Sequence, residues 1–397
     1  MSGDAAVVWD DALAAYDFGA GHPLAPIRVQ LAMHLVRDLG LLQGENVTVV
    51  PPVEIDDDLL LTVHDPEYLA AVHRSSHDPD HHDLHRGLGT DDVPTFPGMH
   101  EASRAVCGAT LAAAQEVHSG RALHAVNLAG GLHHAMPGAA AGFCVYNDIA
   151  VAIRWLLDQG VERIAYIDVD VHHGDGVQAA FWDEPRVLTV SLHESGRSLY
   201  PGTGYPTEIG GPGAIGSAVN VALPPGTDDD GWLRAFHGVV PQLVEEFRPE
   251  ILVTQQGCDT HADDPLAHLA LSVDGQRMTY QALHRLAHRV TGGRWIATGG
   301  GGYSWIDVVP RAWSHLVGEV VGAPVPPETP VPASWRDFVE DRLKVPTPAL
   351  MTDGRDPWVR SWEAGYDPAN AIDAAVLRTR EAVFPYHGLA ADPYHGF

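Results

Sequence analysis

The chain has 397 residues, 45% of them hydrophobic, which is enough apolar material for a large core. Acidic residues outnumber basic ones 52 to 24, a formal net charge of −28, so direct binding to a nucleic-acid backbone is disfavoured and a basic substrate would be attracted. With three scattered cysteines, no basic start followed by an apolar run, and no apolar stretch near the ~20 residues of a membrane span, we expect a soluble, cytoplasmic protein without a disulfide framework.

Strand-like apolar runs alternate with helix-like segments along the chain, which is typical of a mostly parallel α/β sheet. Ligands of open α/β sheets bind at the carboxyl ends of the strands. We therefore expect a single α/β domain whose mostly parallel central sheet is flanked by helices, with the site at that edge. The predicted elements, in chain order, are helix 101–119, strand 125–128, helix 147–159, strand 163–171, strand 187–192, helix 231–247, strand 251–254, helix 274–291 and strand 295–298.

Two segments lie outside this pattern. Residues 75–97 carry His77, His81, His82 and His85 among aspartates. Their irregular spacing favours a solvated loop over a metal-binding tract. After Val321 the composition becomes rich in proline, so we expect residues 1–321 to form the catalytic domain. Residues 322–397 are then an extension that packs on that domain or lies at its periphery.

Residues 164–176 read IAYIDVDVHHGDG, a buried-strand pattern that leads into Asp168, Asp170 and His172. In a strand, this spacing of two places the three side chains on one face, about 7 Å apart in adjacent pairs. Burying two carboxylates and an imidazole without partners would cost several kcal/mol, about 2–7 for each unpaired group. A cation or hydrogen-bond donors must therefore meet them.

Reactive groups follow four of the predicted strands: the pair His133 and His134, the motif just described, Asp259, and Tyr303 after four glycines. This combination suits metal-assisted hydrolysis. Asp170, His172 and Asp259 would supply three ligands and leave one position for water. Zinc lowers the pKa of bound water to about 7, and the same O/N/O donor set also accepts Fe²⁺.

The remaining groups suit proton transfer. His133 and His134 are both candidates for the general base, and each needs a carboxylate behind it to fix its tautomer. Asp168 and Asp175 are the natural partners. Tyr303 could donate its hydroxyl to a developing oxyanion, an interaction worth about 3–4 kcal/mol in the transition state.

Five segments carry a resemblance to a known family: GGLHHAMPGAAAGFCVYNDIA, YIDVDVHHGDGVQAAF, SLHESGRSLYPGTG, GCDTHADDPL and GGGGY. In this order, over roughly residues 7–320, they resemble the histone deacetylase superfamily, which has an arginase/deacetylase-like fold. The Pro-Gly-Thr-Gly segment at 201–204 and the acidic stretch after Cys258 are most similar to the bacterial acetoin-utilisation deacetylases.

The resemblance implies a role for each matching residue. Asp170, His172 and Asp259 would bind zinc, with His134 the likelier general base and Tyr303 polarising the acetamide carbonyl. It pairs His133 with Asp168 and His134 with Asp175. A narrow tube for the acyl-lysine stem would be lined by Gly142, Phe143, Tyr200 and Gly301, with Asp92 at its rim. A structural potassium ion would be held by Asp168, Asp170, His172, Ser191 and the Leu192 carbonyl.

Two positions depart from the family pattern. The tube wall that is commonly phenylalanine is Tyr200 here, preceded by a one-residue insertion. A hydroxyl in an apolar wall needs a partner or solvent, or it costs about 1–3 kcal/mol. Asp91 stands beside Asp92 and competes with it for the rim position.

We therefore expect a zinc-dependent amidohydrolase that removes acetyl groups from lysine side chains of proteins, with a metabolic target such as an acyl-CoA synthetase, in metabolic regulation or acetoin utilisation. The alternative is an acetylpolyamine deacetylase. A binuclear manganese ureohydrolase of the arginase type is disfavoured, because residues 257–261 offer one well-placed carboxylate, Asp259. A binding protein with an inactive site is also disfavoured, because every assigned catalytic position is retained.

Overall fold

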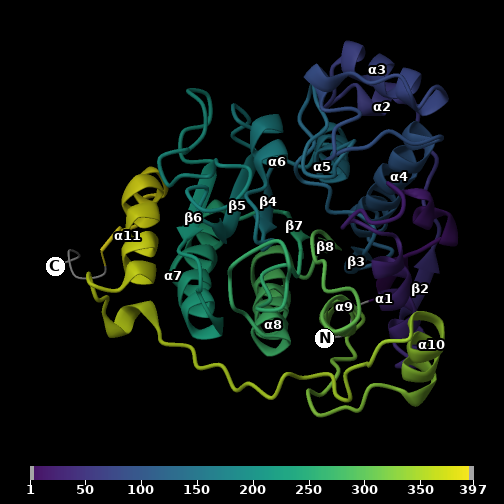
Figure 1. The fold of residues 1–397 in the computed structure, drawn as a ribbon. Coiled ribbons are helices and arrows are strands. Elements are labelled where there is room, and N and C mark those ends of the chain that lie inside the picture. The colour runs from purple at the N-terminus through teal and green to yellow at the C-terminus, as the bar shows by residue number, and fades with distance from the viewer. Residues whose placement is uncertain (1–3, 393–397) are drawn as a thin grey trace.

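The computed structural model describes residues 4–392, and its centre is an eight-stranded parallel sheet with the order β2-β1-β3-β8-β7-β4-β5-β6 (Figure 1). The inner strands are apolar on both faces and fully buried, as in parallel sheets covered by helices on both sides. The strands are β1 Ala5–Val8, β2 Val47–Val50, β3 His124–Asn127, β4 Ile164–Asp168, β5 Val187–Glu194, β6 Ala218–Leu223, β7 Ile251–Gln255 and β8 Trp295–Thr298.

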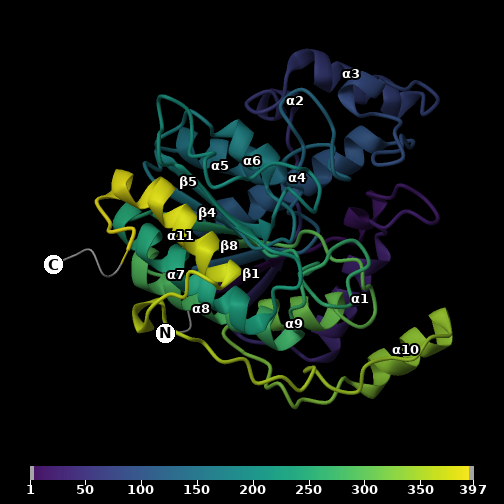
Figure 2. The same ribbon diagram turned by 60° about the vertical axis from the view of Figure 1, so that its left-hand side comes forward.

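Helices cover both faces of the sheet (Figure 2). Helices α1, α9, α8 and α7 pack side by side over one face, and α4 and α5 pack together over the other. The α-helices are α1 Ile27–Asp38, α2 Asp57–Leu60, α3 Pro66–His77, α4 Met99–His118, α5 Asp148–Asp158, α6 Asp175–Ala180, α7 Asp229–Phe247, α8 Val273–Thr291, α9 Val309–Val320, α10 Ala333–Leu343 and α11 Ala371–Val383. Short 3-10 helices span Asp11–Ala15, Leu84–Arg86, Trp362–Ala364 and Phe384–His387.

The predicted fold class is confirmed, and each predicted helix and strand is present within a few residues of its expected bounds, with one exception. The strand predicted over 163–171 ends at Asp168. It stops because side-chain carboxylates take the next backbone amides: Asp168 Oδ1 accepts from Asp170 N at 3.2 Å, and Asp170 Oδ1 accepts from His172 N at 3.0 Å. Such local bonds compete with the sheet ladder. The expectation that the three side chains share one face of a strand is therefore wrong.

Strands β1, β2 and β6 were not predicted. β1 and β2 are four residues long, and β2 is a partly exposed edge strand. The histidines of residues 75–97 are exposed at the end of α3 and in the turns after it, as expected of a solvated loop. None of the helices within residues 4–392 is both long and apolar enough to cross a membrane.

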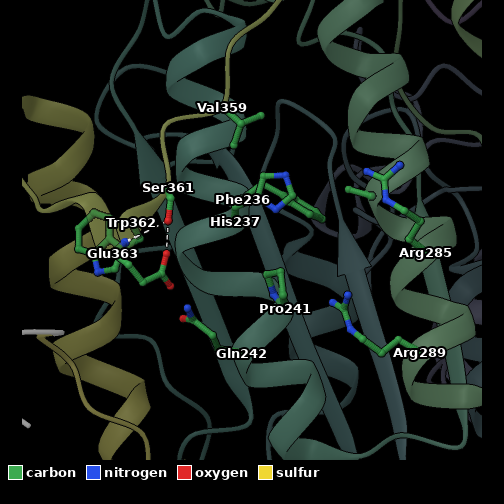
Figure 3. Close-up of a pocket in the computed structure, with 11 residues that line it drawn as sticks. Phe236, His237, Pro241, Gln242, Arg285, Arg289, Val359, Ser361, Trp362 and Glu363 are labelled. Atoms are coloured by element: carbon green, nitrogen blue, oxygen red, sulfur yellow. Dashed lines mark hydrogen bonds between the residues drawn. The ribbon is translucent and has the colours of Figure 1, made fainter.

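The proline-rich extension packs along the outside of the helices. Trp335 of α10 is buried and donates from Nε1 to the Leu31 carbonyl at 3.0 Å. Arg234 of α7 pairs with Asp373 of α11, with 2.8 Å between Nη2 and Oδ2. Figure 3 shows Trp362 beside α7 in a surface pocket that reaches across to α8. This pocket contains none of the predicted site residues.

Candidate active site

The four motif-bearing strands are the four neighbours β3, β8, β7 and β4 in the middle of the sheet. Their last residues are paired in register: Asn127 with Thr298, Thr298 with Gln255, and Gln255 with Asp168. Because all strands run in one direction, the segments that follow them converge at the same edge. The predicted catalytic and metal-binding residues lie there.

Asp170, His172 and Asp259 form one buried group, with one ligand atom from each residue within 4.8 Å of the others. His172 Nδ1 lies 3.1 Å from Asp170 Oδ1 and 3.2 Å from Asp259 Oδ2. Burial and the neighbouring Asp170 raise the pKa of Asp259 to about 7. Burial opposes charge on His172, but its hydrogen bonds to the two carboxylates raise its pKa to about 10. Without a metal, a proton on His172 therefore neutralises part of the carboxylate charge.

Two glycines leave room for the carboxylates of the predicted ligands. A Cβ on Gly257 would lie 2.0 Å from Asp170 Oδ2, and one on Gly301 would lie 1.9 Å from Asp259 Oδ2. Only glycine fits at either position. Val171 N donates to Asp259 Oδ1 at 2.9 Å, which fixes the third of the predicted ligands. Two buried carboxylates and an imidazole, held this way, fit a divalent metal with an O/N/O donor set.

Two histidine–carboxylate pairs lie next to this group. His133 Nδ1 lies 2.7 Å from Asp168 Oδ2, and His134 Nδ1 lies 2.7 Å from Asp175 Oδ1. The two imidazole rings are 4.1 Å apart, and the His134 ring is 5.7 Å from that of His172. A carboxylate accepts only, so each Nδ1 carries the proton and each Nε2 is turned away from its carboxylate.

The two pairs differ in charge. Burial opposes charge on His133, but Asp168 and Asp170 outweigh it and raise its pKa to about 9. Burial and the adjacent His133 lower the pKa of His134 to about 4, despite its bond to Asp175. At neutral pH His134 is therefore the uncharged imidazole, the form that can accept a proton.

Phe143 and Tyr200, two of the residues predicted to line the tube, make ring contacts with predicted catalytic and metal-binding residues. Phe143 packs edge-to-face on Tyr303 at 5.7 Å between ring centroids. The Tyr200 ring lies 5.1 Å from that of His134 and 6.4 Å from that of His172. Tyr200 is 45% exposed, so its side chain is partly solvated and not enclosed in an apolar wall. Burial raises the pKa of Tyr303, which keeps its hydroxyl protonated and able to donate.

Asp92 and Gly301, both predicted to contact substrate, form hydrogen bonds within the chain. Asp92 Oδ2 accepts from Gly142 N at 2.7 Å, so this carboxylate holds the backbone at one of the residues predicted to line the tube. Gly301 N donates to Asp170 Oδ2 at 2.8 Å, which places this glycine against the predicted metal-binding group. A direct contact of either residue with substrate stays a prediction.

The residues predicted to hold potassium are also gathered. Asp168, at the end of β4, is in register with Ser191 of β5, and Leu192 follows it. Ser191 Oγ lies 2.8 Å from His193 Nδ1. Ser191 and Leu192 belong to β5, which lies on one side of β4, whereas Asp259 follows β7 on the other side of β4. The binding of potassium stays a prediction.

Four further residues support the site and were not predicted. Gln255 donates from Nε2 to Asp170 Oδ2 at 2.7 Å, and Tyr166 donates to Asp168 Oδ2 at 2.6 Å. Asp264 Oδ2 accepts from Tyr303 N at 2.7 Å. Buried Arg28 of α1 donates to the Gly302 carbonyl at 2.7 Å and lies over the Tyr303 ring. Gln255 could have been found from its place at a strand end, whereas Arg28 carries no local signal.

The chain is similar to proteins of known family. Residues 22–320 match the model of the histone deacetylase domain. The acetoin utilization protein AcuC of Bacillus subtilis is 39% identical over 382 residues, 95% of this chain and 98% of that protein. AcuC of Staphylococcus aureus strain MRSA252 is 38% identical over 322 residues, 81% of this chain and 82% of that protein. A crystal structure of a histone deacetylase homologue complexed with SAHA superposes with a TM-score of 0.80, at 26% identity, over 95% of this chain and 99% of the other.

Proposed function

The chain belongs to the histone deacetylase family, of the acetoin-utilisation type, and we propose that it is a zinc-dependent amidohydrolase that removes acetyl groups from lysine side chains of proteins. One observation carries this proposal. The group of Asp170, His172 and Asp259 lies beside a neutral histidine that is backed by a carboxylate, His134 with Asp175. Three ligands with a base next to them are what metal-assisted hydrolysis needs.

Asp170, His172 and Asp259 would hold the metal. When bound, it would supply Lewis acidity, which polarises the acetamide carbonyl and lowers the pKa of a water molecule. His134 Nε2 would take the proton from the attacking water, because Asp175 holds the proton on the opposite ring nitrogen. The Tyr303 hydroxyl would donate to the carbonyl oxygen as negative charge develops on it.

His133 would serve as the charged neighbour in this step. Its raised pKa, about 9, keeps it protonated at neutral pH beside Asp168 and Asp170. A fixed positive charge disfavours a second one on His134, so the proton taken from water would pass on readily to the leaving amine. In this proposal His134 is the general base and then the general acid.

A lysine side chain would reach these groups between Phe143 and Tyr200, with Asp92 near the rim. The net charge of −28 favours a basic substrate and suits either a lysine-bearing protein or a polyamine. Because the chain is similar to acetoin utilization proteins over nearly all its length, we propose a metabolic protein, such as an acyl-CoA synthetase, as the target. The potassium ion expected at Asp168, Asp170, His172, Ser191 and Leu192 is part of this proposal.

The test is hydrolysis of an acetyl-lysine peptide and of acetylated spermidine, side by side, with and without a metal chelator. Asp259→Asn serves as the matched variant that keeps the fold but loses a ligand. Chelator-sensitive turnover of the peptide, lost in the variant, is the expected result. Preference for acetylated spermidine would replace the protein substrate by a polyamine. Turnover that survives both the chelator and the variant would refute metal-dependent hydrolysis. Elemental analysis of the purified enzyme and of Asp259→Asn decides between zinc and iron, because the metal at this site is the one that the variant loses.

A further inference from the structure

A second group of histidines lies at the opposite end of the sheet from the candidate active site. His124 opens β3 and is in register with Trp295, the first residue of β8. His284 and His288 are four residues apart on α8, so they lie on one face of that helix. One ring nitrogen from each of the three histidines lies within 4.8 Å of the other two.

His284 is already oriented as a ligand. Its Nδ1 lies 3.2 Å from Oε2 of Glu319, which is buried on α9. The carboxylate only accepts, so Nδ1 carries the proton and Nε2 presents its lone pair. A buried carboxylate behind an imidazole is the usual support of a metal-binding histidine.

The spacing of the two helix histidines matches a shared metal. His284 Nε2 and His288 Nε2 are 3.1 Å apart, a hydrogen bond in which His288 donates to the lone pair of His284. A bound ion would replace this bond. Two nitrogens bound to one tetrahedral ion, at about 2.0–2.1 Å each, lie about 3.3 Å from one another. A change of a few tenths of an ångström would therefore admit the ion between them.

His124 completes the group from the sheet. It is 2% exposed, and its Nδ1 is buried without a hydrogen-bond partner among the described residues. Its ring lies 4.8 Å from that of His284 and 4.9 Å from that of His288, nearly perpendicular to both. Burial and the two neighbouring imidazoles lower the pKa of His124 to about 4, which keeps it in the neutral form that binds metals.

We propose that His124, His284 and His288 bind a divalent transition-metal ion, with zinc as the physiological candidate. Three imidazoles without carboxylate or thiolate ligands suit zinc, nickel, cobalt or copper rather than magnesium or calcium. His284 and His288 are partly exposed, which leaves a route for the ion and a fourth position for water. The ion would tie α8 to β3 and so stabilise the folded chain by linkage.

A different cluster provides the matched control. Asp57, His73 and His100 also come together, but within residues 4–392 none of their buried side-chain polar atoms lacks a hydrogen-bond partner, whereas His124 Nδ1 does. His73 Nε2 lies 2.9 Å from Asp57 Oδ2, and His100 Nδ1 lies 3.0 Å from the hydroxyl of Tyr146. We therefore expect no metal there, and His73→Gln should leave metal binding unchanged.

The experiment measures zinc per chain by mass spectrometry after the full-length protein is stripped with chelator and re-equilibrated at a buffered free zinc concentration. We expect His288→Gln to bind one zinc ion fewer than the wild type and to keep its deacetylase activity. Asp259→Asn should lose the other ion, so the two sites are counted separately. Equal zinc content in His288→Gln and the wild type would overturn the proposal.

Glu319→Gln tests the same site with all three ligands in place. Loss of the carboxylate behind His284 should weaken zinc binding at this site about 10–100-fold. Zinc should also raise the unfolding temperature of Asp259→Asn, and the double variant with His288→Gln should show no such rise. Unchanged zinc affinity in Glu319→Gln, together with a persisting rise in the double variant, would mean that the histidines form only a packed cluster on Trp295.

Discussion

His134 Nδ1 lies 2.7 Å from Asp175 Oδ1, with both side chains buried. This bond fixes the tautomer that leaves Nε2 free to accept a proton. We expect His134→Ala to lower kcat by about 10²–10⁴-fold, the usual contribution of a general base. Metal content should stay near that of the wild type, because His134 is not among the proposed ligands. Steady-state kinetics with elemental analysis of the same samples checks both.

Asp175→Asn is the control for the tautomer. An amide cannot hold the Nδ1 proton as a carboxylate does, so turnover should fall while the imidazole itself remains. Full activity in His134→Ala would assign the base elsewhere, and His133 would then be the remaining histidine of the pair.

The metal-ligand group predicts a pH-dependent loss of metal. His172 has a pKa of about 10 without metal and must lose its proton to bind an ion through Nδ1. Metal affinity should therefore fall as the pH falls, with one proton taken up by His172 for each ion released and a further fraction taken up by Asp259 near and below pH 7. Calorimetric titration of metal into the stripped enzyme in buffers of different ionisation enthalpy measures this proton number, which should be close to one well above pH 7 and exceed one below it.

Asp259→Asn should weaken metal binding at every pH, because one charged ligand is lost. The variant also removes a buried negative charge that lies beside the charge of Asp170. Without metal, the variant should therefore be no less stable than the metal-free wild type. Unchanged metal occupancy in this variant would exclude Asp259 as a ligand.

The sequence predicts the central sheet and the meeting of its motifs, because fully apolar strands must be covered on both faces and parallel strands share one carboxyl edge. Asp259 follows β7 and Asp170 follows β4, and these strands are neighbours. The resemblance adds the pairing of each histidine with its aspartate, which single-strand patterns do not specify.

Other features depend on contacts between distant segments. β4 ends at Asp168 because carboxylates capture backbone amides, a competition that periodicity does not reveal. Arg28 supports the glycine segment 300–302 from across the fold, over 270 residues away in sequence. His124 joins His284 and His288 only once β3 and α8 are packed. The periodicities of strands and helices, two and 3.6 residues, do not show which distant segments of the chain come into contact.

We predict that Tyr303 contributes to the chemical step and little to substrate binding. Its hydroxyl stays protonated because burial raises its pKa, and it would donate most strongly as charge develops on the carbonyl oxygen. Tyr303→Phe should lower kcat about 10²–10³-fold and leave KM within a few-fold of the wild type. Initial-rate kinetics on the acetyl-lysine peptide measures the split. A change confined to KM would make Tyr303 a binding residue instead.

We predict that buried His64 lowers the stability of the folded chain in mild acid. Its Nδ1 lies 3.1 Å from the Met136 carbonyl, and its Nε2 accepts from Asn147 N at 3.0 Å. Protonation would replace that acceptor by a donor, and burial lowers the pKa of His64 to about 4. Between this value and the ordinary value of about 6.5, the unfolded chain binds a proton that the folded chain does not. His64 should therefore lower the free energy of unfolding as the pH falls through this window, by at most about 1.4 kcal/mol per pH unit, and contribute no further change below pH 4.

The matched variant for this prediction is His64→Gln, whose amide can accept from Asn147 and donate to Met136 without titrating. Urea unfolding at several pH values between 7.5 and 4.5 should give a shallower fall in stability for the variant than for the wild type, by the slope of one proton. Equal slopes would mean that His64 protonates in the folded chain with little cost. Because Asn147 Nδ2 also donates to the Ala135 carbonyl at 3.1 Å, the same acid step should loosen the segment that carries His133 and His134. The protection of that segment's amides, taken relative to their intrinsic exchange rates at each pH, should then fall below pH 6 in the wild type and stay level in His64→Gln.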